Sequence, residues 1–421
     1  MRVLSTYTIA LFTLIFACGG DNEKPAEVPD AASIGVDISV DCPAADIKLG
    51  TAVGIGPCID SRSVGGGSGT ELLVRADCTD KNIAGLLDKK HLVLIPTTPT
   101  RDTLWVHFGG SGGQPTNTEN IGSAAMSSGY RYISLAYPNE PSIGSRCSCP
   151  DGPRPADCPG LVRHQVIYGS DISPYFNMIA SESIENRLMA LLRTLDESRP
   201  TEGWGDFLLP NGGPDWTKMA LSGFSQGGGM AGFIARDHLV QRVLYFSKAS
   251  DGAIRALVDP ATYQACTTHS ECAFGICCTA SDVECDTPPE DAYCLESTAG
   301  PVASQGKDTD GDGIGDGDAS TRATPGNRQF AVVHRLEFSF VFSPEIFESW
   351  GMGTPEEFID ADSNDPPYDK SARLFSTALP PRSDCSEHQS MGADPCQPRA
   401  PNGQPAMRKV WLHAMTAPLT E

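Results

Sequence analysis

The fold of this chain is decided by one stretch, Met219-Ala220-Leu221-Ser222-Gly223-Phe224-Ser225-Gln226-Gly227-Gly228-Gly229. Its apolar first half predicts a buried strand, and the residues after Ser225 predict the start of a helix. A strand that turns straight into a helix brings backbones close together, so the positions flanking the serine must lack side chains. Gly223 and Gly227 meet that need. Ser225 would then sit at the tip, strained and exposed, where a helix N-terminus favours developing negative charge. The same pattern also occurs in ordinary glycine-rich turns, so the surrounding chain must decide.

Strands and helices alternate around this stretch. Apolar runs predict strands at 91–96, 103–108, 130–137, 241–247, 329–334 and 372–377, and helices at 120–128, 183–195 and 226–236. Such alternation implies a mostly parallel sheet covered by helices on both faces. The glycines at 109–113 directly follow a strand and offer bare backbone N–H groups, as an oxyanion hole requires, although they also fit a flexible turn. Residues 42–78 predict an irregular lead-in tied by disulfides.

This succession resembles the α/β-hydrolase superfamily, in its branch of bacterial serine esterase-like proteins, over roughly residues 90–252 and 325–415. The resemblance implies the α/β-hydrolase fold and the catalytic order nucleophile, acid, histidine. Ser225 would be the nucleophile, and the backbone N–H groups of Gln226, Gly110 and Ser111 would form the oxyanion hole. A serine hydroxyl is a poor nucleophile at neutral pH, so it needs a base and a carboxylate that orients the base.

The base must be one of the histidines that follow Ser225, which are His238, His269, His334, His388 and His413. His388 lies in a polar loop after the predicted strand 372–377, where the superfamily carries its base. Cys385 and Cys396 would tie that loop closed. The alternative is an ordinary surface histidine. His413, in an apolar C-terminal run, fits a structural role better.

For the acid, the superfamily position follows the strand before the histidine, and Glu337 lies three residues beyond 329–334. The alternative is that Glu337 is an ordinary glutamate in contact with solvent. Asp251, at the end of the preceding strand, is the alternative acid, because some members of the superfamily place it there. Asp360, Asp362 and Asp365 lie in a later loop and rank below both.

The first residues predict export. An apolar stretch too short to span a bilayer ends at Ala17-Cys18, which resembles a bacterial lipoprotein signal with lipid attached to Cys18. The alternative is a plain secretory signal. Gly19, where an Asp would signal inner-membrane retention, implies the outer membrane or the cell surface. The chain has 15 cysteines, and setting aside the lipid-bearing Cys18 leaves 14. This even number suits disulfides in an oxidising compartment. Zinc at Cys147, Cys149 and Cys158 is a weaker alternative, since no histidine spacing accompanies them.

An insertion at 253–325 separates two strands of the sheet. It holds six cysteines, whose pairing the sequence does not fix, and then an acidic run similar to thrombospondin type 3 repeats. Alternate oxygens in that run would bind one structural Ca²⁺, the ligands being Asp308, Asp310, Asp312, Ile314 and Asp316. Ala319 stands where an EF-hand has its glutamate, and an acidic linker is the alternative.

The predicted organisation is a signal peptide at 1–17, a tether at 18–36, the α/β core at 37–252 and 326–421, and the disulfide-rich insertion at 253–325. A net charge of −22 argues against nucleic acid as a partner. We expect a lipid-anchored serine hydrolase that cleaves small or lipid-like carboxylic esters without a catalytic cofactor and meets the membrane only through its lipid. The alternatives are an inactive surface protein for adhesion or matrix binding, and a serine peptidase.

Overall fold

The computed structural model describes residues 44–47, 56–64, 68–147, 158–247, 277–278, 293–294, 319–337, 340, 343–353 and 358–419. All of them belong to the second of two compact units, Met1–Ser39 and Val40–Glu421. Cys18, Asp251 and the predicted calcium ligands 308–316 lie outside the described residues. None of the helices described is both long enough and apolar enough to cross a lipid bilayer.

The core of the second unit is a ten-stranded sheet in the order β13-β14-β12-β9-β8-β5-β6-β4-β3-β2. Its strands are β2 (Ile59–Val64), β3 (Gly69–Arg75), β4 (Lys90–Pro96), β5 (Leu104–Phe108), β6 (Arg131–Leu135), β8 (Met219–Phe224), β9 (Val243–Phe246), β12 (Gln329–His334), β13 (Ile359–Asp360) and β14 (Arg373–Ser376). From β6 through β13 all neighbours are parallel, whereas β2, β3 and β4 pair antiparallel. This is the α/β-hydrolase fold, with β8 near the middle of the sheet.

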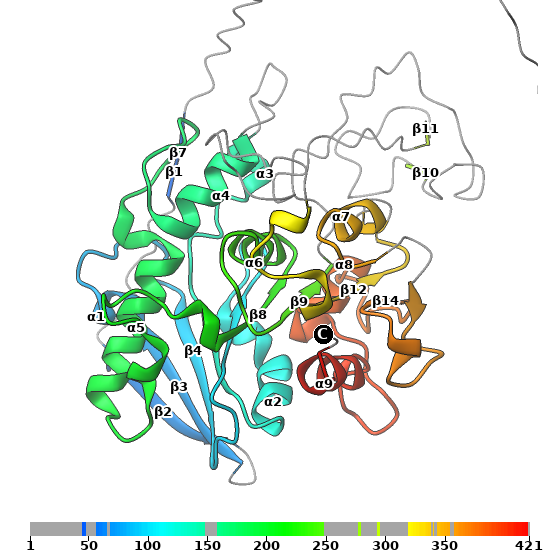
Figure 1. Ribbon diagram of the computed structural model, residues 1–421, viewed down its shortest axis with the longest axis horizontal. Coiled ribbons are helices and arrows are strands. Elements are labelled where there is room, and N and C mark those ends of the chain that lie inside the picture. Colours follow the sequence, from blue (N-terminus) through cyan, green and yellow to red (C-terminus); the bar gives the residue numbers. More distant parts are fainter. Residues whose placement is uncertain are drawn as a thin grey trace, which may run out of the picture. The chain divides into compact units, whose positions relative to one another are not determined.

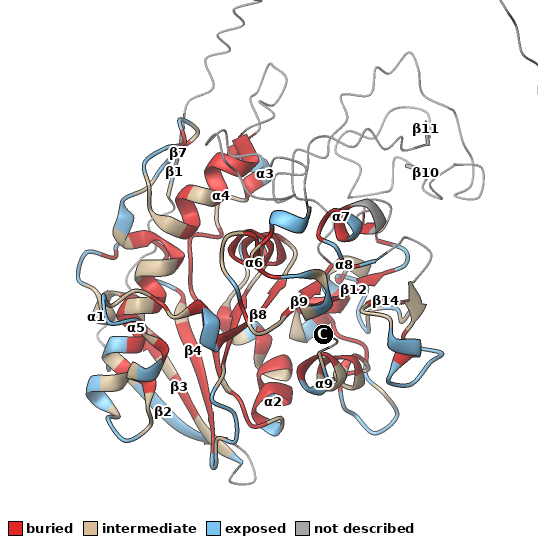
Figure 2. Ribbon diagram, in the orientation of Figure 1, coloured by how far each residue is buried: buried red, intermediate tan, exposed pale blue. Residues whose placement is uncertain are grey.

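Helices cover both faces of the sheet (Figures 1 and 2). One face packs against α4 (Cys158–Tyr168), α5 (Ile184–Ser198), α6 (Gln226–Asp237) and α7 (Ser343–Ser349). The other packs against α2 (Glu119–Ser127), α8 (Glu387–Gly392) and α9 (Arg408–Thr416), of which α2 and α9 lie side by side. The sequence of β5 is one apolar run because both faces of the strand are buried. Leu104 and Val106 pack in the core on the α6 face of the sheet, and Trp105 packs in the core on the α9 face.

The remaining elements are short. They are β1 (Ala45–Asp46) paired with β7 (Phe176–Asn177), β10 (Cys277–Cys278) paired with β11 (Tyr293–Cys294), and the helices α1 (Ala76–Thr79) and α3 (Ile143–Arg146). The last described residues of the predicted insertion pack on the core. Arg322 is buried and donates to the Gly232 carbonyl of α6.

The lead-in at 42–78 was expected to be irregular, and this expectation is wrong. Its residues form β2 and β3, which extend the main sheet, and the Cys58–Cys78 disulfide ties the end of this hairpin. Strand β2 has four exposed residues in succession, because it is an edge strand. Edge strands carry polar residues that prevent further pairing, so β2 lacks the apolar signal of the central strands.

The zinc alternative for the segment around Cys147 is also wrong, because Cys147 and Cys158 form a disulfide. The sequence did not predict α4, which begins at this cysteine and has Pro159 in its first turn. Proline is tolerated there, since the first N–H groups of a helix have no partner within it.

Candidate active site

Ser225 occupies the turn between β8 and α6 with φ +52° and ψ −121°. This positive φ is unfavourable for any residue with a Cβ, and the surrounding packing enforces it. A Cβ at Gly223 would overlap the Gly227 carbonyl, and one at Gly227 would overlap the Phe108 carbonyl of β5. The two glycines are therefore a steric requirement of the turn, and the serine stands at the carboxyl end of β8, where α6 begins.

The glycine loop after β5 lies against this turn. A Cβ placed on Gly110 would be 3.3 Å from the Cβ of Ser225. The Ser111 hydroxyl donates to the Gln226 Oε1 at 3.0 Å, which joins the loop to the first residue of α6. In the part of the chain that the structure describes, no hydrogen bond uses the backbone N–H of Gly110, Ser111 or Gln226. These three N–H groups are therefore candidate donors to an oxyanion next to Ser225.

Glu337 and His388 meet beside the turn. The Oε2 of Glu337 lies 2.6 Å from the Nδ1 of His388, and its Oε1 accepts the His334 N–H at 3.2 Å. Glu337 is only 1% exposed, whereas a quarter of the imidazole side chain reaches the surface. The pair forms because the carboxyl ends of the parallel strands β12 and β14 share one edge of the sheet with β8.

His388 was expected in a polar loop, but it is the second residue of the helix α8. The helix forms because Ser386 and Gln389 make a capping box, in which each side chain accepts the backbone N–H of the other. The Cys385–Cys396 disulfide closes the segment that contains α8. A short polar helix of this kind has too few apolar residues to give a helical pattern.

The imidazole of His388 packs against Phe224, the residue before Ser225, with 4.9 Å between ring centroids. A Cβ at Gly392 would overlap the same phenylalanine ring, so α8 approaches the turn as closely as a glycine allows. The structure thus gathers a strained serine, an imidazole and a buried carboxylate at one edge of the sheet. This set of groups can activate a hydroxyl.

The other candidates have different surroundings. Asp362 accepts hydrogen bonds from Ser376 and Thr377 at the end of β14. His413 lies between Phe330 and Tyr368 in packing contacts. Burial lowers the pKa of His334, whose Nε2 lies 3.3 Å from the Ala378 carbonyl. No group of three His, Cys, Asp or Glu side chains that could hold a metal ion occurs among the described residues.

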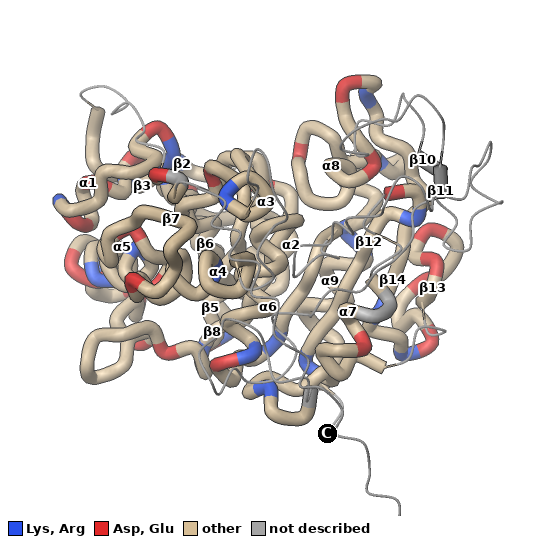
Figure 3. Tube along the Cα trace, turned by 90° about the horizontal axis from the view of Figure 1, so that it is seen from above, with Lys and Arg blue, Asp and Glu red and all other residues tan. Residues whose placement is uncertain are grey.

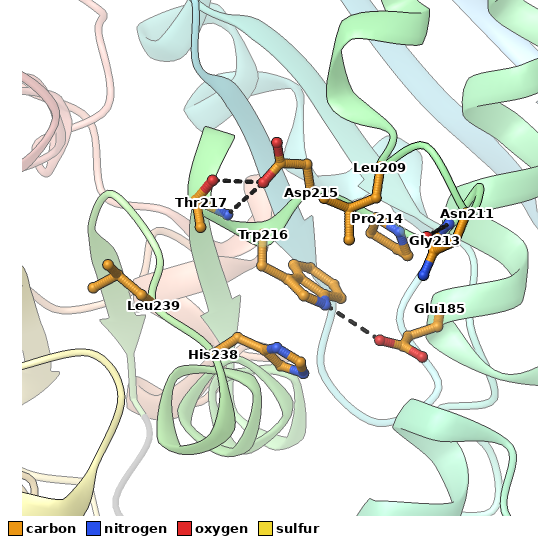
Figure 4. Close-up of a pocket in the computed structure, with 10 residues that line it drawn as sticks. All are labelled: Glu185, Leu209, Asn211, Gly213, Pro214, Asp215, Trp216, Thr217, His238 and Leu239. Carbon is orange, nitrogen blue, oxygen red and sulfur yellow. Dashed lines mark hydrogen bonds between the residues drawn. The ribbon is translucent and has the colours of Figure 1, made fainter.

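A cavity of about 310 Å³ lies at the opposite end of β8. Its lining is Glu185, Leu209, Asn211, Gly213, Pro214, Asp215, Trp216, Thr217, His238 and Leu239. In Figure 4 the Trp216 indole lies between Glu185 and His238, and it donates to the Glu185 carboxylate at 3.2 Å. Since this cavity precedes β8 and Ser225 follows the strand, it is separate from the candidate active site. In Figure 3 acidic and basic positions are spread over the molecule, and strands such as β2, with Asp60 and Arg62, carry them as well as helices and loops.

No protein-family model matches this chain, and no curated protein matches its sequence. Solved structures with a similar course of the chain include an esterase from Pseudomonas putida (13% identity, 85% of this chain and 81% of that chain covered, TM-score 0.32). Carboxyl esterase 2 from Tuber melanosporum has 15% identity over 79% of each chain, with a TM-score of 0.28. For an esterase from Pyrobaculum calidifontis the match covers 38% of this chain and 41% of that one, at 17% identity and a TM-score of 0.21. The strand order of the sheet, and not these likenesses, identifies the fold.

The segment that carries His388 docks on α2 through Asp394. The Oδ2 of Asp394 accepts the Asn120 N–H at 3.0 Å, while its buried Oδ1 has no hydrogen-bond partner among the described residues. Burial raises the pKa of this carboxyl group from the usual 3.8 to about 7, and the Glu119 carboxylate nearby adds to the increase. Below about pH 7 the folded protein therefore favours the neutral form of Asp394.

This raised pKa predicts how stability depends on pH. Between the unfolded and the folded pKa only the folded state keeps the proton, so the contribution of Asp394 to stability is present below about pH 4 and is lost as pH rises through 7. Asp394→Asn mimics the neutral acid and is expected to raise Tm above that of the wild type at pH 8, with a much smaller gain at pH 5. Thermal unfolding at both pH values measures this.

Asp80→Asn is the control of opposite sign, because the Asn82 N–H lowers the pKa of Asp80. It is expected to reduce Tm at pH 8, where the wild-type carboxylate is ionised. An Asp394→Asn variant whose Tm difference from the wild type is the same at both pH values would contradict a protonated Asp394.

Proposed function

We propose that this chain is a serine hydrolase that cleaves carboxylic esters through an acyl-enzyme intermediate. One observation carries the proposal: a buried carboxylate, Glu337, binds the Nδ1 of His388, and the His388 ring lies against the residue that precedes a strained Ser225. A buried carboxylate beside an imidazole is what a serine nucleophile requires.

In the proposed mechanism Glu337 holds the His388 tautomer with its proton on Nδ1, so that Nε2 accepts the proton of the Ser225 hydroxyl. The serine oxygen attacks the carbonyl carbon of the ester. The carbonyl oxygen of the ester then becomes an oxyanion, which is held by the N–H groups of Gln226 and of Gly110 or Ser111. His388 returns the proton to the leaving alcohol. Water then attacks the acyl-serine with His388 as base, which releases the acid. All of these steps use groups of the chain itself.

Two exposed leucines favour an apolar ester. Leu336 precedes Glu337 and is 60% exposed, and Leu379 follows β14 and is 63% exposed. Because β12 and β14 are parallel neighbours, both leucines lie at the edge of the sheet that carries His388 and Glu337. We therefore propose small or lipid-like carboxylic esters as the substrates.

The test is labelling of the folded protein with a fluorophosphonate, which forms a covalent adduct only with an activated serine. Mass spectrometry of a tryptic digest is expected to locate the adduct in the peptide 219–236, which contains Ser225. p-Nitrophenyl acetate should be hydrolysed, and the labelled protein should have lost that activity. Folded protein without an adduct, or with an adduct on another serine, would refute the proposal.

We also propose that the chain is exported, lipid-anchored through Cys18, and held at the outer membrane or the cell surface. Metabolic incorporation of a fatty-acid analogue, abolished by Cys18→Ser, tests the anchor. We further propose a structural Ca²⁺ on the loop 308–316, since alternate carboxylates suit that ion. Calorimetric titration of the calcium-free protein with Ca²⁺ tests this site, and ester turnover should not require the ion.

A further inference from the structure

The direction of each candidate oxyanion donor, a backbone N–H group, is fixed by the peptide unit to which it belongs. A peptide unit is planar and trans, so the N–H of one residue points opposite to the carbonyl of the residue before it. The direction of the Gly110 N–H is therefore set by the Gly109 carbonyl, and that of the Ser111 N–H by the Gly110 carbonyl. Whatever holds these two carbonyls decides where the two donors point.

Tyr137 holds the first carbonyl. Its hydroxyl donates to the Gly109 oxygen at 2.7 Å, and its ring packs edge-on against Phe108 of β5. Burial raises the pKa of Tyr137 above its ordinary value, so the hydroxyl stays protonated and remains a donor in neutral solution. This hydrogen bond turns the Gly110 N–H away from Tyr137.

Asn139, two residues further on, holds the second carbonyl. Its Nδ2 donates to the Gly110 oxygen at 2.7 Å and to the Gly113 oxygen at 3.0 Å, which uses both hydrogens of the amide. Its own backbone carbonyl accepts the Gly112 N–H at 3.1 Å. The side chain is 3% exposed, so water does not compete for these bonds.

Lys89 decides which end of the Asn139 amide faces the loop. An ammonium group only donates, and the Lys89 Nζ lies 2.8 Å from the Asn139 Oδ1 and 3.1 Å from the Gly112 oxygen. The Oδ1 must therefore face the lysine, and the Nδ2 must face the carbonyls of the loop. The Lys89 side chain is 2% exposed, and Glu140 supplies the opposite charge at 3.7 Å.

We infer that Tyr137 and Asn139 are positioning residues that aim the N–H groups of Gly110 and Ser111 at the oxyanion, and that Lys89 acts through Asn139. This inference rests on the proposed function and deepens it. The three residues do not touch the reacting atoms: Lys89 directly precedes β4, and Tyr137 and Asn139 follow the end of β6, the neighbour of both β4 and β5 in the sheet.

Tyr137→Phe and Asn139→Ala are each expected to lower kcat for p-nitrophenyl acetate by about 10-fold or more, less than the loss of a donor itself, with KM little changed. The affinity for a trifluoromethyl ketone, whose serine adduct carries an oxyanion, should fall by the same factor as kcat/KM. Tyr137→Phe removes one oxygen atom and should fold even if the alanine variant does not.

Matched controls lose comparable buried bonds elsewhere. Tyr132→Phe removes a hydroxyl bonded to Thr118, and Gln165→Ala removes an amide bonded to the Phe176 carbonyl. Both are expected to keep the wild-type kcat. Lys89→Met should resemble Asn139→Ala, and the double variant should be no worse than Asn139→Ala alone, because the lysine acts through the asparagine.

The failures can be told apart. If the wild-type protein shows no ester turnover that Ser225→Ala abolishes, the proposed function and this inference are both overturned. An active wild type whose Tyr137→Phe variant keeps both kcat and ketone affinity overturns the inference alone. The inference is also overturned if the control variants lose as much kcat as Tyr137→Phe and Asn139→Ala, or if kcat falls in step with Tm in all variants. In either case the residues would act only on stability.

Discussion

Ser225→Ala is expected to lower kcat for ester hydrolysis by about a million-fold, since removal of a serine nucleophile abolishes the covalent path. The fold should survive. Ser225 has φ +52°, and an alanine carries the same Cβ into the same strained backbone, so the strain is unchanged. The Ser225 hydroxyl makes no hydrogen bond that caps α6, so its loss is expected to cost little stability. Kinetics with p-nitrophenyl acetate, together with a Tm measurement, test both statements.

Ser247→Ala is the matched control. Ser247 also has a positive φ, +44°, is 1% exposed, and directly follows β9, the strand next to β8. Its buried Oγ has no hydrogen-bond partner in the described part of the chain. This variant is expected to keep wild-type turnover. If Ser225→Ala retained turnover while Ser247→Ala lost it, the nucleophile would have been assigned to the wrong strand.

The central strands could be predicted because burial on both faces leaves an unbroken apolar run. The prediction of 329–334 coincides with β12, and the predicted helix at 183–195 begins where Ser183 caps α5. The elements that escaped prediction carry weaker signals. Strand β2 is a polar edge, and α8 is a capped polar turn without an apolar face. Local pattern therefore predicts the middle of this sheet better than its margins.

For the site, the catalytic order that the superfamily resemblance implies led to Ser225, Glu337 and His388 as candidates. Glu337 and His388 follow neighbouring strands, and the structure brings them within hydrogen-bonding distance, while Asp251 lies outside the described residues. The residues behind the oxyanion loop could not be predicted. Lys89, Tyr137 and Asn139 meet only because the loops around β4, β5 and β6 converge, and no spacing in the sequence records that approach.

Glu337→Gln is the second change with a large expected effect, a loss of about four orders of magnitude in kcat. Steady-state kinetics measure it, with Tm as a check on folding. Glu185→Gln is the control, because the partly buried Glu185 also accepts a hydrogen bond from a ring N–H, but at the far end of β8. It should keep wild-type turnover. A Glu337→Gln variant with near-normal kcat would exclude Glu337 as the acid and turn attention to Asp251.

The size of the loss follows from the two hydrogen bonds of Glu337. One carboxylate oxygen accepts the His334 N–H, which only an acceptor can do, so the oxygen of a glutamine must remain there. Its NH₂ group then faces the Nδ1 of His388, where the wild type has an acceptor. The imidazole can bond to that group only by carrying its proton on Nε2, the nitrogen that must accept the serine proton. Since the exchange alters one atom and no packing, a lost kcat with an unchanged Tm would assign Glu337 to holding the tautomer.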